Sequence, residues 1–166
     1  MLSNVDLSHL ARRFKIPDFR GVFTKDTLPS QALKGAYVIN MEDDLDSHGH
    51  SNPGTHWVAL FISSDGNAAY SDSFGSPPPE SVVHFGEHGK KHRRHLAYTS
   101  KQLQNIQSDV CGWYAIYFLV FMSRRGETFR NMNDYTDLFD DDVRKNRTIL
   151  EHLLEDLHTG RKGLIF

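Results

Sequence analysis

Residues 110–122 read VCGWYAIYFLVFM, and this stretch decides the fold of the chain. The residues are apolar on every side of a helical wheel, which is typical of a helix buried at the centre of a domain. Residues 123–126 (SRRG) follow with cations and then a glycine, as is typical of a helix C-terminus. The apolar run is shorter than the roughly 20 residues that a membrane-spanning helix needs. The sequence therefore predicts a buried helix and no membrane span.

Short β-branched and aromatic runs upstream of this helix predict the strands that surround it. Residues 56–62 (HWVALFI) are apolar on both faces, as expected of a central strand. Residues 63–67 (SSDGN) supply a turn and residues 68–72 (AAYSD) supply the returning strand. If residues 63–67 form the hairpin loop, the register makes His56 and Asp72 diagonal neighbours on one face, about 7–8 Å apart at the backbone.

The other segments alternate between helical and extended patterns and complete an α+β fold. We expect helices near residues 4–14, 80–87 and 143–157, and strands near 19–23, 36–40 and 96–100. The 166 residues carry 19 Lys and Arg against 21 Asp and Glu, an average globular composition with a formal net charge of -2. The sequence predicts one domain over residues 1–166.

The cysteine content indicates the compartment. The sequence contains a single cysteine, so it cannot form an internal disulfide, and its N-terminus lacks the pattern of a secretory signal. We therefore expect a reducing compartment, the cytosol or the nucleus.

Cys111 lies where a polar loop meets the buried helix, a position that favours a reactive thiol. A helix N-terminus stabilises negative charge and lowers a thiol pKa, the more so beside an imidazolium. His56 opens the central strand at the rim of the sheet, where a general base can lie, and Asp72 is its expected neighbour. From position alone two plainer interpretations stay open: Cys111 is a small buried apolar residue, and Asp72 is a turn carboxylate.

Three motifs together resemble the adenovirus protease (adenain) family and, more loosely, the SUMO-protease family. They are GTHW at 54–57, YSDSFG at 70–75 and QNIQSDVCGWY at 104–114. The resemblance implies a papain-like cysteine protease fold with adenain-type connectivity, in which a central mixed sheet packs on a buried helix starting at Cys111. It also implies that Cys111 is the nucleophile and His56 the base.

The same resemblance implies that Asp72 orients the histidine and that Gln104 completes an oxyanion hole with the backbone N–H of Cys111. Adenain has a glutamate where Asp72 stands, whereas SUMO proteases have an aspartate. Gln107 is a rival amide, but the family spacing favours Gln104. Adenain also holds an activating peptide by a disulfide to a second cysteine, which this sequence lacks. We expect no cofactor that the chemistry requires, and any peptide or DNA activator is not disulfide-linked.

The resemblance also suggests the substrate. In related proteases the Trp after the catalytic His forms a wall of a narrow cleft, and Trp57 has that place here. We expect Gly112 to leave room for a substrate backbone and Trp113 to help form the wall of the site. We expect cleavage after glycine-containing sites in polypeptides, such as capsid or core precursors of a virus or virus-like mobile element. The expected protein is a monomer in the virion and in the host nucleus or cytosol.

Other functions stay open. The same site also suits an isopeptidase that removes ubiquitin-like modifiers or, as a minor option, an acetyltransferase. A basic run favours DNA contact and a non-catalytic binding module; its cations are Lys90, Lys91, Arg93 and Arg94. A metal site is a further possibility, because His48, His50 and His56 lie near acidic residues. Structural zinc sites favour cysteines or a closely spaced second pair of ligands, and neither is visible, so we expect no metal.

Overall fold

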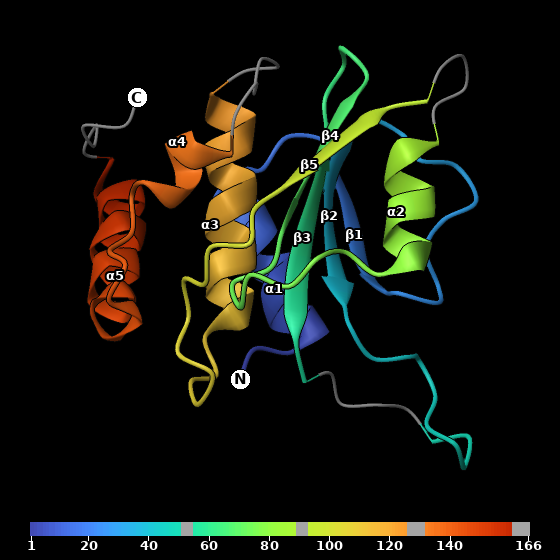
Figure 1. Cartoon of the computed structure of the whole chain (residues 1–166), viewed down its shortest axis with the longest axis horizontal. Helices are drawn as coiled ribbons and strands as arrows, with labels where there is room; N and C mark the ends of the chain where they lie inside the picture. Colours follow the sequence, from blue (N-terminus) through green and yellow to red (C-terminus); the bar gives the residue numbers. More distant parts are fainter. Residues whose placement is uncertain (51–54, 89–92, 126–131, 161–166) are drawn as a thin grey trace.

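A computed structural model describes residues 1–50, 55–88, 93–125 and 132–160 (Figure 1). Five strands form one mixed sheet in the same order as along the chain. β1 pairs with β2 and β4 with β5 in parallel, while β3 runs antiparallel to both of its neighbours. The strands are β1 Phe19–Thr24, β2 Gly35–Asn40, β3 Trp57–Ile62, β4 Asn67–Ser71 and β5 His95–Tyr98. The predicted α+β class with a mixed sheet is confirmed.

The central strand β3 is buried along its whole length, as its apolar sequence predicts. Alternate residues point to opposite faces of a strand, so Ala59 and Phe61 join one core cluster while Val58 and Leu60 join the other. The register with β4 is the predicted one, with Ile62 opposite Ala68 and Ala59 opposite Ser71. A strand buried on both faces tolerates no slip in register, because a slip would exchange its two faces.

Helices cover both faces of the sheet. α2 lies against one face, α1 and α3 lie against the other, and α5 packs on the outer side of α3 (Figure 1). The helices are α1 Asn4–Arg13, α2 Glu80–Glu87, α3 Cys111–Arg124, α4 Asn133–Thr136 and α5 Val143–Thr159. The short α4 was not predicted, because one turn of helix leaves no periodic pattern in a sequence. No helix in the described ranges is long and apolar enough to cross a membrane.

Local sequence signals set the start of α1 and the end of α5. Ser3 caps α1 by accepting a hydrogen bond from the backbone N–H of Asp6, and the Asp6 carboxylate accepts from the backbone N–H of Ser3. α5 ends at Gly160, whose φ of 68° is the left-handed conformation that favours glycine. The central helix α3 starts at Cys111, and most of its residues are buried between the sheet and α5. The prediction of a buried central helix is confirmed.

Candidate active site

The fold brings three predicted residues to one end of the sheet. β3 and α3 begin at this end and β4 finishes there (Figure 1). His56 directly precedes β3, Asp72 directly follows β4, and Cys111 is the first residue of α3. A hairpin of two consecutive strands and a helix distant from it in the sequence therefore each contribute polar side chains at this end of the sheet.

His56 and Asp72 form a short hydrogen bond. The His56 Nε2 atom lies 2.8 Å from Asp72 Oδ1, and the Asp72 side chain is 2% exposed. The same carboxylate oxygen accepts the backbone N–H of Phe74 at 2.8 Å, which holds the carboxylate in place. An ionised carboxylate only accepts hydrogen bonds, so His56 Nε2 carries the proton in this contact. The tautomer assigned in this way leaves Nδ1 as the nitrogen that can take up or release a proton.

His56 Nδ1 is buried and forms no hydrogen bond within the described part of the chain. Burial lowers the His56 pKa, but the hydrogen bond to Asp72 and the interactions with the Cys111 thiol outweigh it and raise the pKa to about 9. Buried polar atoms in proteins almost always have partners, and an exception often marks a chemical role. The His56 imidazole is therefore hydrogen-bonded to Asp72 at one nitrogen, and the Cys111 thiol contributes to its raised pKa.

The turn after β4 supports the histidine from a second side. The Phe74 ring stacks on the His56 ring with 4.5 Å between centroids and 19° between planes. Gly75 closes the turn with its N–H bonded to the Asp72 carbonyl at 2.9 Å. Its φ is +76°, and an added Cβ would lie 2.5 Å from the carbonyl oxygen of Ser100, so glycine is required here. The supporting role of Phe74 was not predicted, although the Phe-Gly pair belongs to the motif at 70–75.

Gln104 lies in the buried loop that leads to α3. Its Oε1 accepts the Ser73 hydroxyl at 2.6 Å, and its Nε2 donates to the Ser108 carbonyl at 2.9 Å. Gln107, the rival amide, is exposed on the same loop. The structure thus places the side chain of Gln104 among buried polar groups and that of Gln107 in solvent.

Trp57, Gly112 and Trp113, the three residues expected to contact substrate, pack against N-terminal residues of the chain. Trp57 is 3% exposed, and its indole N–H donates to the Leu2 carbonyl at 2.9 Å. A Cβ added at Gly112 would lie 3.1 Å from Leu2 and 3.2 Å from Leu7, so N-terminal side chains pack on that side of the residue. The role of Gly112 in substrate binding stays a prediction. The wall role of Trp57 stays a prediction.

Trp113 is half-buried on the first turn of α3. It lines a cavity of about 430 Å³ together with residues of α1 such as His9 and Leu10. The side chain therefore faces α1, and its role as a wall of the substrate site also stays a prediction.

The basic run lies partly outside the described residues, which do not include Lys90 and Lys91. Arg93 forms an ion pair with Glu87, and Arg94 donates to the carbonyl oxygens of His88 and Ala32, each at 2.7 Å. Both guanidinium groups thus have partners within the protein. DNA contact by this run stays a prediction.

The histidines of the acidic loop do not join His56. The Nδ1 atom of His50 lies 3.6 Å from Oδ2 of Asp46, and the rings of His48 and His50 stack with 6.3 Å between their centroids. His56 is instead hydrogen-bonded to Asp72. Within the described ranges, no group of three or more His, Cys, Asp or Glu side chains has the arrangement of a metal site.

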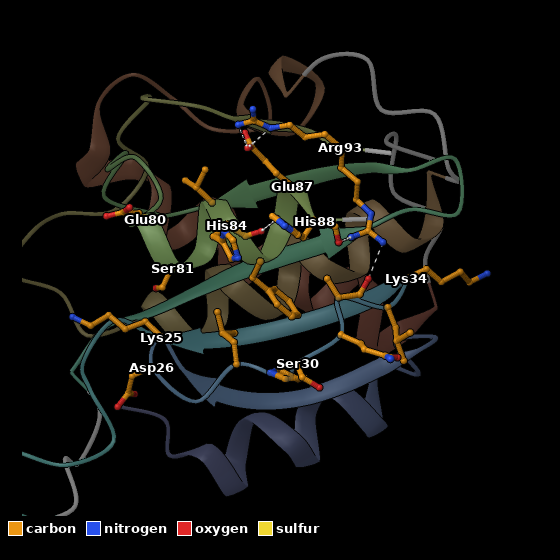
Figure 2. Close-up of a pocket in the computed structure, with 18 residues that line it drawn as sticks. Lys25, Asp26, Ser30, Lys34, Glu80, Ser81, His84, Glu87, His88 and Arg93 are labelled. Atoms are coloured by element: carbon orange, nitrogen blue, oxygen red, sulfur yellow. Dashed lines mark hydrogen bonds and ion pairs between the residues drawn. The ribbon is translucent and has the colours of Figure 1, made fainter. Parts of the chain in front are cut away.

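A cavity larger than the one beside Trp113 lies elsewhere. It has a volume of about 1130 Å³ and is bounded by residues 25–34, by α2 and by Arg93 and Arg94 (Figure 2). None of its lining residues is His56, Asp72 or Cys111. The candidate active site is therefore separate from this cavity.

Comparisons with known proteins give distant structural likeness alone. No family model matches the sequence. No curated protein matches it either. Among solved structures, the SUMO protease Ulp1 with its catalytic cysteine oxidised to a sulfinic acid is similar at 17% identity and a TM-score of 0.35, over 74% of this chain and 53% of that one. The sulfenic acid form is similar at 16% identity and a TM-score of 0.32, over 73% and 53%.

This chain thus spans about half the length of those structures.

Proposed function

We propose that this chain is a cysteine peptidase in which Cys111 is the nucleophile, His56 the general base and acid, and Asp72 the residue that orients His56. One observation carries the proposal: a single imidazole is hydrogen-bonded to a buried carboxylate at Nε2 and has its pKa raised to about 9 in part by the Cys111 thiol. Asp72 uses Nε2, so the buried Nδ1 is the nitrogen that remains to exchange a proton with the thiol.

The arrangement allows His56 to activate the Cys111 thiol. Proton transfer from the Cys111 sulfur to His56 Nδ1 creates the nucleophile, and the Asp72 carboxylate stabilises the resulting imidazolium. Cys111 is the first residue of α3, where the free N–H groups and the partial positive charge of the helix stabilise a thiolate.

The reaction then proceeds in two halves. The thiolate forms a C–S bond with the carbonyl carbon of the scissile bond, and the Gln104 amide and the backbone N–H of Cys111 donate to the oxyanion. The C–N bond breaks as imidazolium gives its proton to the leaving amine, which leaves a thioester. Water attacks the thioester as His56 takes one of its protons. The C–S bond then breaks, His56 returns that proton to the sulfur, and the product acid loses its remaining proton to solvent to become the carboxylate.

We propose glycine on the acyl side of the cleaved bond. Cys111 is 2% exposed and the His56 side chain 16%, so the reacting atoms are largely covered, and a substrate backbone without side-chain bulk at the cleaved bond can approach them most closely. The substrates are polypeptides; the resemblance to adenain favours capsid or core precursors of a virus or virus-like element. An isopeptide bond after Gly-Gly has the same acyl side and is the second candidate.

The experiment is a cleavage assay on a peptide library, with a ubiquitin-like protein fused through Gly-Gly as a second substrate. We expect cleavage after glycine by the native protein and none by Cys111→Ala, because an alanine methyl cannot attack a carbonyl. Residual proteolysis by that variant above background would contradict the proposal. Cleavage of the fusion but of no library peptide would assign the isopeptidase activity instead of the endopeptidase activity.

A further inference from the structure

We infer that Ser73 is a positioning residue that fixes the side-chain amide of Gln104 for the reaction. The inference rests on the proposed function and gives a role to a residue of the motif at 70–75 for which the sequence alone suggests none. Ser73 directly follows Asp72, and its side chain is buried. Its hydroxyl donates to Gln104 Oε1 at 2.6 Å, a bond between two buried side chains.

Ser73 holds Gln104 by its backbone as well as by its hydroxyl. The Ser73 carbonyl accepts the backbone N–H of Leu103 at 2.8 Å and that of Gln104 at 2.9 Å. The loop that carries Gln104 is therefore fastened to the end of β4 at both the main chain and the side chain. Two consecutive residues thus position the two groups: Asp72 holds the general base His56, and Ser73 holds the oxyanion donor Gln104.

The hydrogen-bond partners decide which end of the Gln104 amide carries the N–H. The Ser108 carbonyl can only accept, so it faces the Nε2 end, 2.9 Å away. Oε1 then faces Ser73, whose hydroxyl has to donate. Rotation of the amide by half a turn would set two carbonyl oxygens against each other at Ser108. Ser73 and Ser108 thus hold the amide in one orientation.

This orientation matters because the amide nitrogen has two hydrogens. One is used by Ser108, and the direction of the other is fixed once the amide plane is fixed. A donor held in advance costs no reorganisation when negative charge develops on the substrate oxygen. The Ser73 bond also draws electron density toward Oε1, which strengthens the N–H as a donor.

The test compares Ser73→Ala with Ser73→Thr, which keeps a hydroxyl, and with Ser71→Ala. Ser71 is a buried serine of β4 that interacts with Tyr135 and lies outside the site, so its variant controls for loss of a buried hydroxyl. With active enzyme counted by titration of Cys111, we expect Ser73→Ala to lower kcat about 10-fold at unchanged KM, a part of the roughly 10²-fold effect of losing a whole oxyanion donor. Ser73→Thr should recover most of the rate, and Ser71→Ala should keep it.

A double-mutant cycle separates positioning from a general structural role. In a Gln104→Ala background, Ser73→Ala should change kcat less than about 2-fold, because the group that it positions is already absent. An equal loss in both backgrounds would overturn the inference. The alkaline limb of the pH–rate profile should stay in place, since a shift would mean that Ser73 acts through Asp72 and His56.

A readout independent of turnover tests the same contact. In an NMR spectrum of the native protein, the Gln104 side-chain NH₂ should give two well-separated signals with slow hydrogen exchange. Ser73→Ala should merge or broaden these signals, and Ser71→Ala should leave them in place. Unchanged Gln104 signals in Ser73→Ala would overturn the inference even if the enzyme is active. A native protein that cleaves nothing but shows the expected signals would contradict the proposed function and support the Ser73–Gln104 contact.

Discussion

At the scale of single residues, the charge of His56 is set by opposing effects. Burial alone would lower its pKa, yet the Asp72 carboxylate and the Cys111 thiol raise it to about 9. The folded-state pKa then exceeds the ordinary value near 6.5, so the protonated imidazole stabilises the fold at pH values below about 6.5. That contribution is lost as the pH rises through about 9.

The same pKa predicts the alkaline limit of activity. The leaving amine needs the proton of the imidazolium, so kcat/KM should fall as the pH rises through about 9. In Asp72→Asn the carboxylate is lost while burial remains, so the falling limb should move to lower pH and the maximal rate should drop. A pH–rate profile of both proteins measures this. An unmoved limb in Asp72→Asn would show that another group sets the His56 pKa.

Gln104 and Gln107 offer a matched pair on one loop. Gln104→Ala should lower kcat by about 10²-fold or more at nearly unchanged KM, the usual effect of losing one oxyanion donor. Gln107→Ala removes an exposed side chain and should leave kcat within about 2-fold of the native value. Steady-state kinetics on the two variants decide between them, and a larger loss at Gln107 would show that the spacing argument identified the wrong residue.

At the scale of elements, the C-terminal helix α5 supports the loop that carries Gln104. Asn146 of α5 is fully buried and donates to the Leu103 carbonyl at 3.0 Å and to the Asp140 carbonyl at 2.9 Å. Its Oδ1 accepts the backbone N–H of Asp140 at 2.8 Å. Leu103, the residue before Gln104, is thus hydrogen-bonded to the C-terminal part of the chain. The sequence motifs suggest no function for that part.

Removal of this contact should destabilise the fold. Asn146→Ala leaves buried backbone groups without partners, at about 1–3 kcal/mol each, so the free energy of unfolding should fall by about 2–4 kcal/mol. Urea unfolding followed by circular dichroism measures the loss. His152→Ala, an exposed change on the same helix, should stay within about 0.5 kcal/mol of the native protein. Equal stability of Asn146→Ala and native protein would mean that α5 does not support the loop.

The predictable elements are those with a local pattern. The apolar run at 110–122 predicts the buried helix, and the loop at 63–67 predicts the register that brings His56 beside Asp72. The contacts of Ser73 and Asn146 were not predictable, because each joins a side chain to a loop distant in the sequence and leaves no periodicity. Packing of Leu2 over Gly112 was missed for the same reason.

At the scale of the whole molecule, the sheet separates two regions of the surface. His56, Asp72 and Cys111 lie at the end of the sheet where α3 begins, whereas the cavity of about 1130 Å³ lies beside α2 on the other face (Figures 1 and 2). A ligand in that cavity would not touch His56, Asp72 or Cys111. The three proposed catalytic residues come from one chain, so no second subunit is needed to assemble them.

Activity should therefore not require a disulfide-linked peptide. Cys111 is the single cysteine, so a disulfide to a partner would consume the proposed nucleophile. We expect specific activity in reducing buffer to stay constant over a dilution series of the pure protein, since no bound partner is lost on dilution. A steep fall on dilution would indicate a reversible activator, and inactivity until a peptide is linked by a disulfide would contradict the prediction.

The most direct test is reaction of the folded protein with a Gly-Gly peptide vinyl sulfone, which forms a stable thioether with a thiolate, followed by intact-mass and peptide mapping. We expect one adduct, at Cys111, that forms quickly in the native protein, slowly in His56→Ala and not at all in Cys111→Ala. The cysteine is single, so the mapping is unambiguous. A thiol that stays unreactive in the native fold and reacts only after unfolding would show that Cys111 is a buried packing residue, and would contradict the account.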